Sequence, residues 1–351
     1  MIRFAPSLDP GDARCRLDTL IPSHLDPSPF QPALRRLQRM SDAWAAFCPP
    51  PWPAPGLCLT PEIHYQSELW FPLAELQPVF ERFHRAALGH GPLTGEGPLA
   101  DAASWAGAAA ALPPYLSDCT TPARLLSRLL GDGEARRRYL FWSGMPKRFY
   151  GGAVNRYPHQ AAVIRRWLLQ RTGRSEQPLR CLDAACGDGA ATYGLARLLL
   201  DHGVAQEDFR VEGWTIDPLE VWAAAHCAFP HDPPRQEAFR RWSAPVFASG
   251  AERSLVFRQV DLLAMPRDRQ RFDLILCNGL LGGPIINKRE EIRRIVDDLA
   301  ALLMPGGVVL AADSFHGGWK QKCPHREVQA LFASAGLVPF EAGEGIGGLK
   351  R

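Results

Sequence analysis

From about residue 157 onward, short apolar runs alternate with helix-like segments, and this alternation restricts the fold more than any other feature. The pattern of residues 179–185 predicts a strand, and that of 192–203 a helix. A second strand and helix follow at 209–217 and 219–229. Strands that alternate with helices form a parallel sheet covered on both faces, and right-handed crossovers make it doubly wound. We therefore expect an α/β, mostly parallel, Rossmann-like sheet.

The alternation continues to the end of this region after an insert at residues 230–252. An amphipathic helix at 159–173 precedes the first strand. Two further strands are expected at 255–263 and 271–281. A helix at 288–303 then ends at a Met-Pro-Gly-Gly turn, and a fifth strand follows at 307–315. We therefore expect one domain over residues 151–351.

The first 150 residues have a different texture and predict a mostly helical, proline-rich module. The segment 48–56 reads CPPPWPAPG, which cannot lie inside a helix or a central strand because proline lacks the amide donor. Helical spacing is present at 76–91 and 100–116. At 121–133 Thr121 is placed to cap a helix that Gly131 ends. We expect this module to bind or dock the substrate, although its sequence names no chemistry.

Composition excludes several classes of protein. The 351 residues include 40 basic and 37 acidic side chains, so no strong global field draws the chain to nucleic acid or to an anionic membrane. No apolar run reaches the roughly 18 residues of a spanning helix, and the start lacks a signal-peptide core. The nine cysteines form no C-x-x-C pair, which argues against a zinc site or a disulfide scaffold. We expect a soluble cytoplasmic protein with reduced, mostly buried thiols.

The first strand runs into a glycine loop, Asp183-Ala184-Ala185-Cys186-Gly187-Asp188-Gly189. Its two glycines allow a sharp turn and a close approach of the backbone to a ligand. The helix that follows presents free amides, which suit a carboxylate or phosphate. The loop is neither G-x-G-x-x-G nor a G-K-[ST] loop, which weakens the dinucleotide and nucleoside-triphosphate hypotheses.

Acidic and amide residues follow the other strands, at the edge where ligands bind in such sheets. Asp217 ends the second strand and is placed to accept hydrogen bonds from ribose hydroxyls, or to cap the next helix. Asp261, followed by Leu262, ends the third strand, where it would accept from an adenine amino group or begin a turn. The fourth strand ends at Cys277-Asn278.

Taken in order, these motifs resemble those of class I S-adenosylmethionine-dependent methyltransferases. The stretch LDAACGDG is similar to the family's first motif, L-D-x-G-C-G-x-G, with Ala185 in place of the first glycine. The resemblance covers about residues 178–315 and implies S-adenosylmethionine as cofactor. The residues that it assigns to the cofactor are Asp183, Ala185, Cys186, Gly187, Gly189, Asp217, Asp261, Leu262, Cys277 and Asn278.

A narrower resemblance is to CheR-type methyltransferases, which esterify glutamate side chains of chemotaxis receptors. Residues 193–196 read Tyr-Gly-Leu-Ala, as after that family's glycine loop, and Cys277-Asn278 is close to its fourth-strand ending. Arg156-Tyr157-Pro158-His159-Gln160 preserves its R-x-P-x-Q spacing. The resemblance assigns Arg156 to the cofactor and acceptor region.

The chain departs from the CheR pattern near the acceptor. The family's fourth-strand motif continues to a tyrosine that lines the acceptor site, whereas residues 280–287 read LLGGPIIN. The amino-terminal module lacks clear similarity to the family's receptor-docking domain. The methyl acceptor, a protein side chain such as glutamate or a small molecule, therefore stays open.

A carboxylate acceptor needs no base, whereas a phenol, alcohol or amine can require one. Candidate catalytic residues are Arg156 and His316, with Tyr150 and His159 as further bases. Two alternatives remain beside a methyltransferase: a non-catalytic S-adenosylmethionine-binding protein and, less favoured by the loop, a nucleotide-dependent oxidoreductase. Nucleic-acid methylation is disfavoured because Asn278-Gly279-Leu280-Leu281 is not an N-P-P-[YF] motif.

Overall fold

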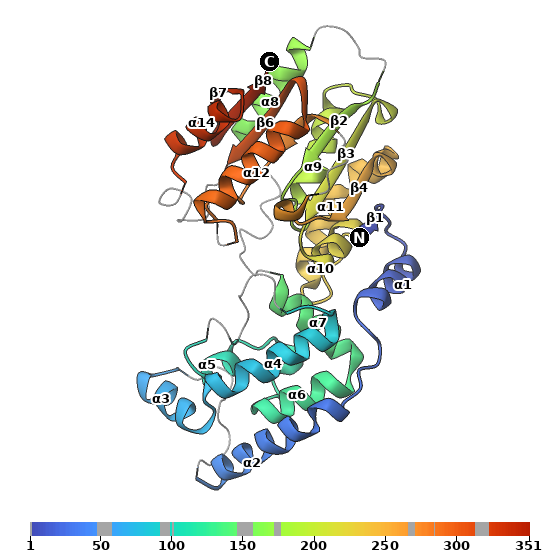
Figure 1. The fold of residues 1–351 in the computed structure, drawn as a ribbon. Coiled ribbons are helices and arrows are strands. Elements are labelled where there is room, and N and C mark those ends of the chain that lie inside the picture. The colour runs from blue at the N-terminus through green and yellow to red at the C-terminus, as the bar shows by residue number, and fades with distance from the viewer. Residues whose placement is uncertain are drawn as a thin grey trace. The chain divides into compact units, whose positions relative to one another are not determined.

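The computed structural model divides the chain into two compact units (Figure 1). The helical unit comprises Arg14–Lys147, and the sheet unit comprises Met1–Ala13 together with Arg148–Arg351. The structure describes residues 2–47, 58–91, 99, 102–145, 157–171, 177–265, 271–283, 285–312 and 323–351. The first 13 residues thus group with the sheet and not with the helices that follow them in sequence.

The sheet unit is built on eight described strands in the order β1-β4-β3-β2-β5-β6-β8-β7. The five central strands, from β4 to β6, pair in parallel, whereas β1, β8 and β7 pair antiparallel to their neighbours. This confirms the doubly wound, mostly parallel sheet. The strands are β1 Arg3–Phe4, β2 Leu179–Asp183, β3 Phe209–Thr215, β4 Leu255–Gln259, β5 Phe272–Leu276, β6 Leu303–Ala312, β7 Leu337–Ala342 and β8 Gly345–Lys350.

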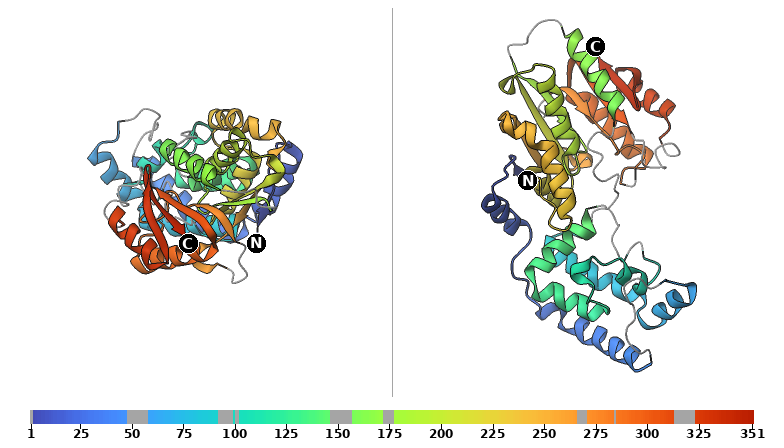
Figure 2. Two further views of the ribbon diagram at one scale, coloured as in Figure 1. Left: turned by 90° about the horizontal axis from the view of Figure 1, so that it is seen from above. Right: turned by 180° about the vertical axis from the view of Figure 1, so that it is seen from behind.

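Helices cover both faces of this sheet, as the view along it shows (Figure 2). The face that carries α12 and α14 encloses an apolar cluster that includes Ile275, Ile295 and Phe332. On the opposite face Tyr193 packs against Phe239 and Phe257. The helices of this unit are α8 Pro158–Gln170, α9 Ala190–Asp201, α10 Pro218–His226, α11 Pro233–Ala248, α12 Arg289–Leu302 and α14 His325–Ser334; the short turn η5 spans Leu262–Ala264.

The structure refines the turn expected after the helix at 288–303. α12 ends at Leu302, and the next residue already belongs to β6. Leu303 pairs with Phe272 and Val308 pairs with Leu274, so the intervening Met-Pro-Gly-Gly stretch forms an irregularity within the strand. The helix ends just before the Met-Pro-Gly-Gly stretch, as predicted, but Leu303 already pairs with β5, so this stretch belongs to β6 and is not a separate turn.

The amino-terminal segment is held to the sheet unit by several backbone and side-chain contacts. β1 pairs with β4 in antiparallel register, Arg3 opposite Arg258. The Ser7 amide donates to Ala225 O at 2.9 Å, and the Trp222 indole donates to Ala13 O at 2.8 Å. A two-residue strand carries no periodicity that a sequence pattern can reveal, so β1 was not expected.

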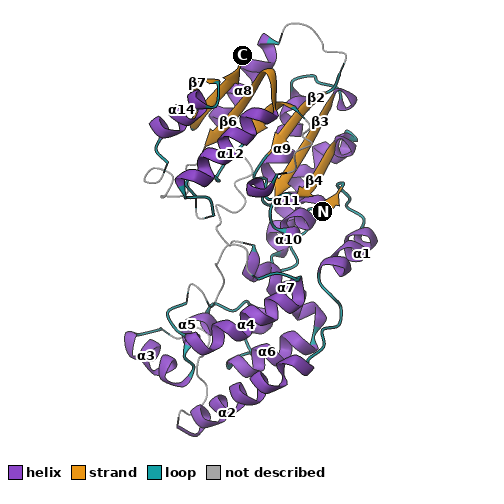
Figure 3. Cartoon of the chain, viewed as in Figure 1, coloured by secondary structure: helices purple, strands orange, loops and turns teal. Residues whose placement is uncertain are grey.

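The helical unit contains only helices and loops among its described residues (Figure 3). Thr121 Oγ1 accepts from the Arg124 amide, which confirms the predicted cap, whereas the helix expected at 100–116 is only six residues long. The segment 48–56 lies outside the described residues. The helices are α1 Pro10–Leu20, whose first residues belong to the sheet unit, α2 Gln31–Phe47, α3 Pro61–Trp70, α4 Leu73–Leu88, α5 Trp105–Ala110, α6 Pro122–Gly131 and α7 Gly133–Gly144; η1 Ser28–Phe30 and η2 Pro114–Leu116 are single turns.

Two further observations concern the described residues as a set. None of their helices combines the length and apolar character that crossing a membrane requires. Their eight cysteines are free thiols, and six of them are buried, as the sequence predicted.

Candidate cofactor and active site

The glycine loop leaves the carboxyl end of β2 at the centre of the sheet. The Ala184 amide donates to Leu276 O and the Cys186 amide to Trp214 O, so backbone bonds to β5 and β3 fix the loop on both sides. Gly187 and Gly189 have φ values of +52° and +84°. A Cβ on Gly189 would lie 2.8 Å from Ala224 Cβ. Both the conformation and the space therefore require glycine at this position.

A cavity of about 310 Å³ opens beside this loop. Asp183, Ala185, Cys186 and Asp188 line it from the loop, and Asn278 lines it from the end of β5. It continues between α8 and α9, where Trp242 of α11 also contributes. The cavity thus lies at the carboxyl edge of the sheet, where the alternation of strands and helices predicted a ligand site.

Asp183 lines this cavity and is 1% exposed. Its Oδ2 accepts from Thr192 Oγ1 at 2.8 Å, a contact between the end of β2 and the first turn of α9. A buried carboxylate with a hydroxyl partner keeps its charge at less cost than an unpartnered one. Thr192 therefore orients a cavity-lining acid.

Asn278 and Gln160 both line this cavity and are hydrogen-bonded to each other. The two side-chain amides exchange hydrogen bonds of 2.8 and 3.1 Å, and Asn278 Oδ1 also accepts from the Ala312 amide. The carboxylate of Glu344 accepts from the His159 and Gln160 amides at 2.9 Å each. Glu344 therefore caps α8 from the β7–β8 turn and holds Gln160 against Asn278. The R-x-P-x-Q spacing was the only signal for Gln160, and nothing in the sequence pointed to Glu344.

The two acids after β3 occupy different positions. Asp217 Oδ1 accepts from the Leu219 amide at 2.8 Å and caps α10. Glu220 Oε2 instead accepts from Thr215 Oγ1 at the end of the strand. Burial raises the pKa of Glu220 to about 8, with a further contribution from the charge of Asp217. The sequence pattern pointed to Asp217 as a ribose-binding acid and gave no signal for Glu220.

Asp188, between the two glycines, is tied to the insert that follows β3. Arg235 of α11 contacts Asp188 Oδ2 at 2.6 Å, and the two side chains are 13% and 14% exposed. The guanidinium also lies over the Phe229 ring, 4.3 Å from its centroid. The insert expected at 230–252 thus supplies a charged partner to the glycine loop.

The remaining predicted cofactor residues lie in distinct environments. Asp261 Oδ1 accepts from the Leu263 amide and caps η5, while Leu262 is buried in the apolar cluster of that face. Cys277 is 1% exposed in the same cluster, and burial raises its pKa to about 12. The side chains of Leu262 and Cys277 therefore pack in the core, and a cofactor role would involve their backbone.

The predicted catalytic residues Arg156 and His316, and also Tyr150, lie outside the described residues. His159 is exposed, and its amide is one of the two that Glu344 caps. In the stretch 280–287 Leu281 and Ile286 form an isolated β-bridge and are buried in the core. Leu281 and Ile286 thus pack inward, whereas Ile285 between them in sequence is 41% exposed.

A family comparison now bears on this geometry. Residues 153–316 match the family model described as CheR methyltransferase, SAM binding domain. The match spans the glycine loop, the central strands and the insert. Within the sheet unit, residues 153–316 thus match an S-adenosylmethionine-binding methyltransferase domain. This domain resembles the CheR type, as its motifs predicted.

Solved structures with a similar chain course include several methyltransferases. An O-methyltransferase family protein from Burkholderia thailandensis is 17% identical (TM-score 0.36; 65% of this chain, 63% of that one). CalS10, an amino pentose methyltransferase from Micromonospora echinaspora, is 16% identical (TM-score 0.37; 58% and 96%). The [4+2]-cyclase SpnF is 18% identical (TM-score 0.34; 51% and 58%), so less than two thirds of that chain is spanned. A comparison with curated proteins finds no match.

The residues of the methyltransferase domain fit S-adenosylmethionine as cofactor. A Cβ at Gly189 would meet Ala224 of α10 and Phe257 of β4, so the loop backbone can lie against these elements only without a side chain there. Asp183 and Asn278 bring acidic and amide groups to the cavity, which suits the amino and carboxylate groups of an amino-acid moiety. The backbone amides at the start of α9 add donors at the loop.

Proposed function

We propose that the protein is a CheR-like methyltransferase that transfers a methyl group from S-adenosylmethionine to a carboxylate or another nucleophilic acceptor. The acceptor class comprises protein side chains such as glutamate, and small molecules. The match of residues 153–316 to the CheR family carries this proposal. The cavity beside the glycine loop, with Asp183 and Asn278 in its wall, supports it.

The cofactor, when bound, supplies a methyl group on a sulfonium that is already activated for nucleophilic attack. The task of the protein is to hold donor and acceptor in line, and positioning of this kind can lower a barrier by several kcal/mol. The glycine loop and the Gln160–Asn278 pair are fixed by hydrogen bonds to three strands and to Glu344. A rigid cavity wall of this kind favours one orientation of the bound donor.

Arg156 is the proposed partner of the acceptor region. It lies two residues before Pro158, the first residue of α8, and Glu344 anchors the start of that helix. A guanidinium can hold a carboxylate acceptor through two parallel hydrogen bonds. His316, or else Tyr150 or His159, would take the proton from an acceptor that needs a base.

The helical unit is proposed to bind or dock the acceptor. Its described residues do not indicate a particular substrate. The division of the chain into two compact units supports separate roles, cofactor binding in the sheet unit and acceptor binding in the helical unit. We propose a cytoplasmic protein without membrane insertion and without a nucleic-acid substrate. The free thiols support the cytoplasmic location, and the balanced charge supports the absence of a nucleic-acid substrate. The expected domain division at residue 150 is part of the same proposal.

A non-catalytic S-adenosylmethionine-binding protein is the second candidate. The inward packing of Leu281 and Ile286, where the CheR pattern has an acceptor-lining tyrosine, favours it. Turnover distinguishes the two candidates.

Binding and turnover are tested in sequence with the full chain. Calorimetry with S-adenosylhomocysteine is expected to show one site per chain, and an absence of binding would refute both candidates. Methyl-labelled cofactor is then incubated with candidate acceptors, carboxylate peptides first. Label transfer that is lost in Arg156→Ala supports the methyltransferase, whereas binding without transfer to any acceptor supports the second candidate.

A further inference from the structure

Two carboxylates follow β3 within four residues, and the structure uses them in different ways. Asp217 is the residue before α10, and its Oδ1 accepts from the Leu219 amide at 2.8 Å. This is the ordinary work of a helix-capping aspartate, which satisfies one of the free amides of the first turn. Neither Asp217 nor Glu220 is among the residues that line the cavity beside the glycine loop, so side-chain direction distinguishes the two.

Glu220 occupies the third helical position, where a glutamate commonly bonds back to the amide of the capping residue. That arrangement is replaced here. The Asp217 amide donates to Thr215 Oγ1 at 3.4 Å, and the Thr215 hydroxyl donates to Glu220 Oε2 at 2.5 Å. The carboxyl group of Glu220 is thereby turned back from the helix toward the carboxyl end of β3.

The other oxygen of Glu220 points to the glycine loop. A Cβ built on Gly187 would lie 3.8 Å from Glu220 Oε1. Within the described part of the chain no hydrogen bond involves Oε1, and the side chain is only partly buried. An acceptor oxygen is therefore available between the end of β3 and the loop, where a sugar that follows the loop would lie.

We propose that Glu220, and not Asp217, is the carboxylate that accepts hydrogen bonds from the ribose hydroxyls of the bound cofactor. The inference rests on cofactor binding by this domain. Thr215 acts as the positioning residue that holds the carboxyl group at the strand end. The charged groups around Glu220 are Asp217 and Asp188, which repel its charge, and Arg235, which attracts it.

The test compares two conservative variants of the full chain by calorimetry with S-adenosylhomocysteine at pH 9, because the Glu220 carboxyl, whose pKa burial raises to about 8, is ionised there. Glu220→Gln removes the carboxylate and is expected to weaken binding about tenfold or more, as for a lost charged hydrogen bond. Asp217→Asn keeps a good capping side chain and is expected to change the dissociation constant by less than about threefold. Thermal unfolding without ligand checks that both variants fold.

A ligand analogue separates a direct contact from a structural effect. Against an S-adenosylhomocysteine analogue without the two ribose hydroxyls, Glu220→Gln and wild type are expected to bind with equal affinity. Equal weakening against both ligands, or a greater loss in Asp217→Asn than in Glu220→Gln, would overturn the inference. Failure of the wild type to bind either ligand would refute the proposed function itself, and the inference with it.

Discussion

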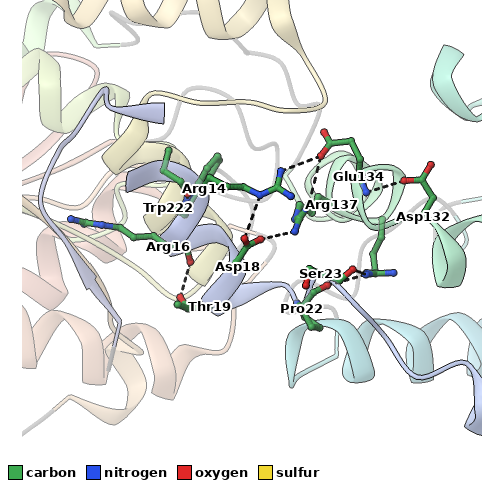
Figure 4. A network of polar contacts seen from close by, with 12 residues as sticks. Arg14, Arg16, Asp18, Thr19, Pro22, Ser23, Asp132, Glu134, Arg137 and Trp222 are labelled. Carbon is green, nitrogen blue, oxygen red and sulfur yellow. Dashed lines mark hydrogen bonds and ion pairs between the residues drawn. The ribbon is translucent and has the colours of Figure 1, made fainter. Parts of the chain in front are cut away.

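The helical unit and the sheet unit both bury charged side chains, but they surround them differently. In the helical unit Arg136 is 0% exposed, and its guanidinium donates to four carbonyl oxygens. Those carbonyls belong to the end of α6 and to Pro22 and Ser23 before α2 (Figure 4). In the sheet unit Asp183, which is 1% exposed, and Glu220, which is partly buried, each accept a hydrogen bond from a threonine hydroxyl near the end of a strand.

The two units use their buried polar side chains for different purposes. Arg136 meets backbone carbonyls that the ends of helices and turns leave without partners, so its role is to complete the fold. The neighbouring Arg137, 3% exposed, instead forms an ion pair with the Asp18 carboxylate between α7 and α1 (Figure 4). The acids of the sheet unit keep acceptor capacity at the edge where a ligand binds, which is a functional arrangement.

The largest effect is expected from the helical unit. Arg136→Met leaves four buried carbonyls without their donor and should lower the free energy of unfolding by about 3–5 kcal/mol. Urea denaturation measures it, with Arg128→Met, an exposed arginine in a helix pair with Asp132, as the control that changes by less than about 1 kcal/mol. A loss below 1 kcal/mol in Arg136→Met would break the comparison.

The glycine loop comes next. Gly189→Ala places a Cβ 2.8 Å from Ala224 Cβ and 2.9 Å from Phe257 Cε1 at a φ of +84°, which should cost about 2–4 kcal/mol. Gly306→Ala is the matched control because its φ is +76° but no atom lies within 4 Å of the new Cβ. Its cost should be about 1 kcal/mol. Equal melting temperatures for the two variants would show that close packing does not decide the glycine at 189.

The ion pair between Arg235 and Asp188, which holds the glycine loop, should affect cofactor affinity more than the free energy of unfolding. Arg235→Ala and Asp188→Asn each release the 2.6 Å contact, and each is expected to weaken S-adenosylhomocysteine binding by about 3–10-fold because the loop is less well held. Arg241→Ala, on the same helix but 72% exposed, is the control. If the double variant weakens binding as the product of the two single effects, the pair is not coupled and this role of the ion pair is refuted.

The smallest effect is a pH dependence of stability in the ligand-free protein. The pKa of Glu220 is about 8 in the fold and near 4.5 when unfolded, so the folded state binds the extra proton between these values. The stabilising contribution is therefore complete below pH 4.5 and is lost as pH rises through 8. The melting temperature of the wild type should fall by a few degrees between pH 6 and pH 9 relative to Glu220→Gln. A constant difference between the two proteins over that range would contradict the prediction.

Local patterns along the chain were sufficient to predict the fold class and the order of the motifs. Apolar runs such as 271–276 and amphipathic helices such as 289–302 carry their own periodicity, and the glycines at 187 and 189 mark a loop that only they can form. The cap at Thr121 was predictable for the same reason, because its partner is three residues away.

Contacts between distant residues had no such signal. Glu344 caps α8 from 184 residues away, and Arg235 reaches Asp188 across 47 residues. Asp217 is a further case in which the sequence left the role open, because it allowed both a ribose contact and a helix cap. Side-chain direction, which distinguishes Asp217 from Glu220, cannot be obtained from the sequence.

The sequence by itself thus determined the Rossmann-like sheet, its glycine loop and the acids at the strand ends, because spacing along the chain encodes local structure. Only the tertiary structure decided that Glu220 faces the loop, that α11 contacts the loop through Arg235, and that the first 13 residues belong to the sheet. These features depend on the packing of elements far apart in sequence, where geometry and not spacing selects each partner.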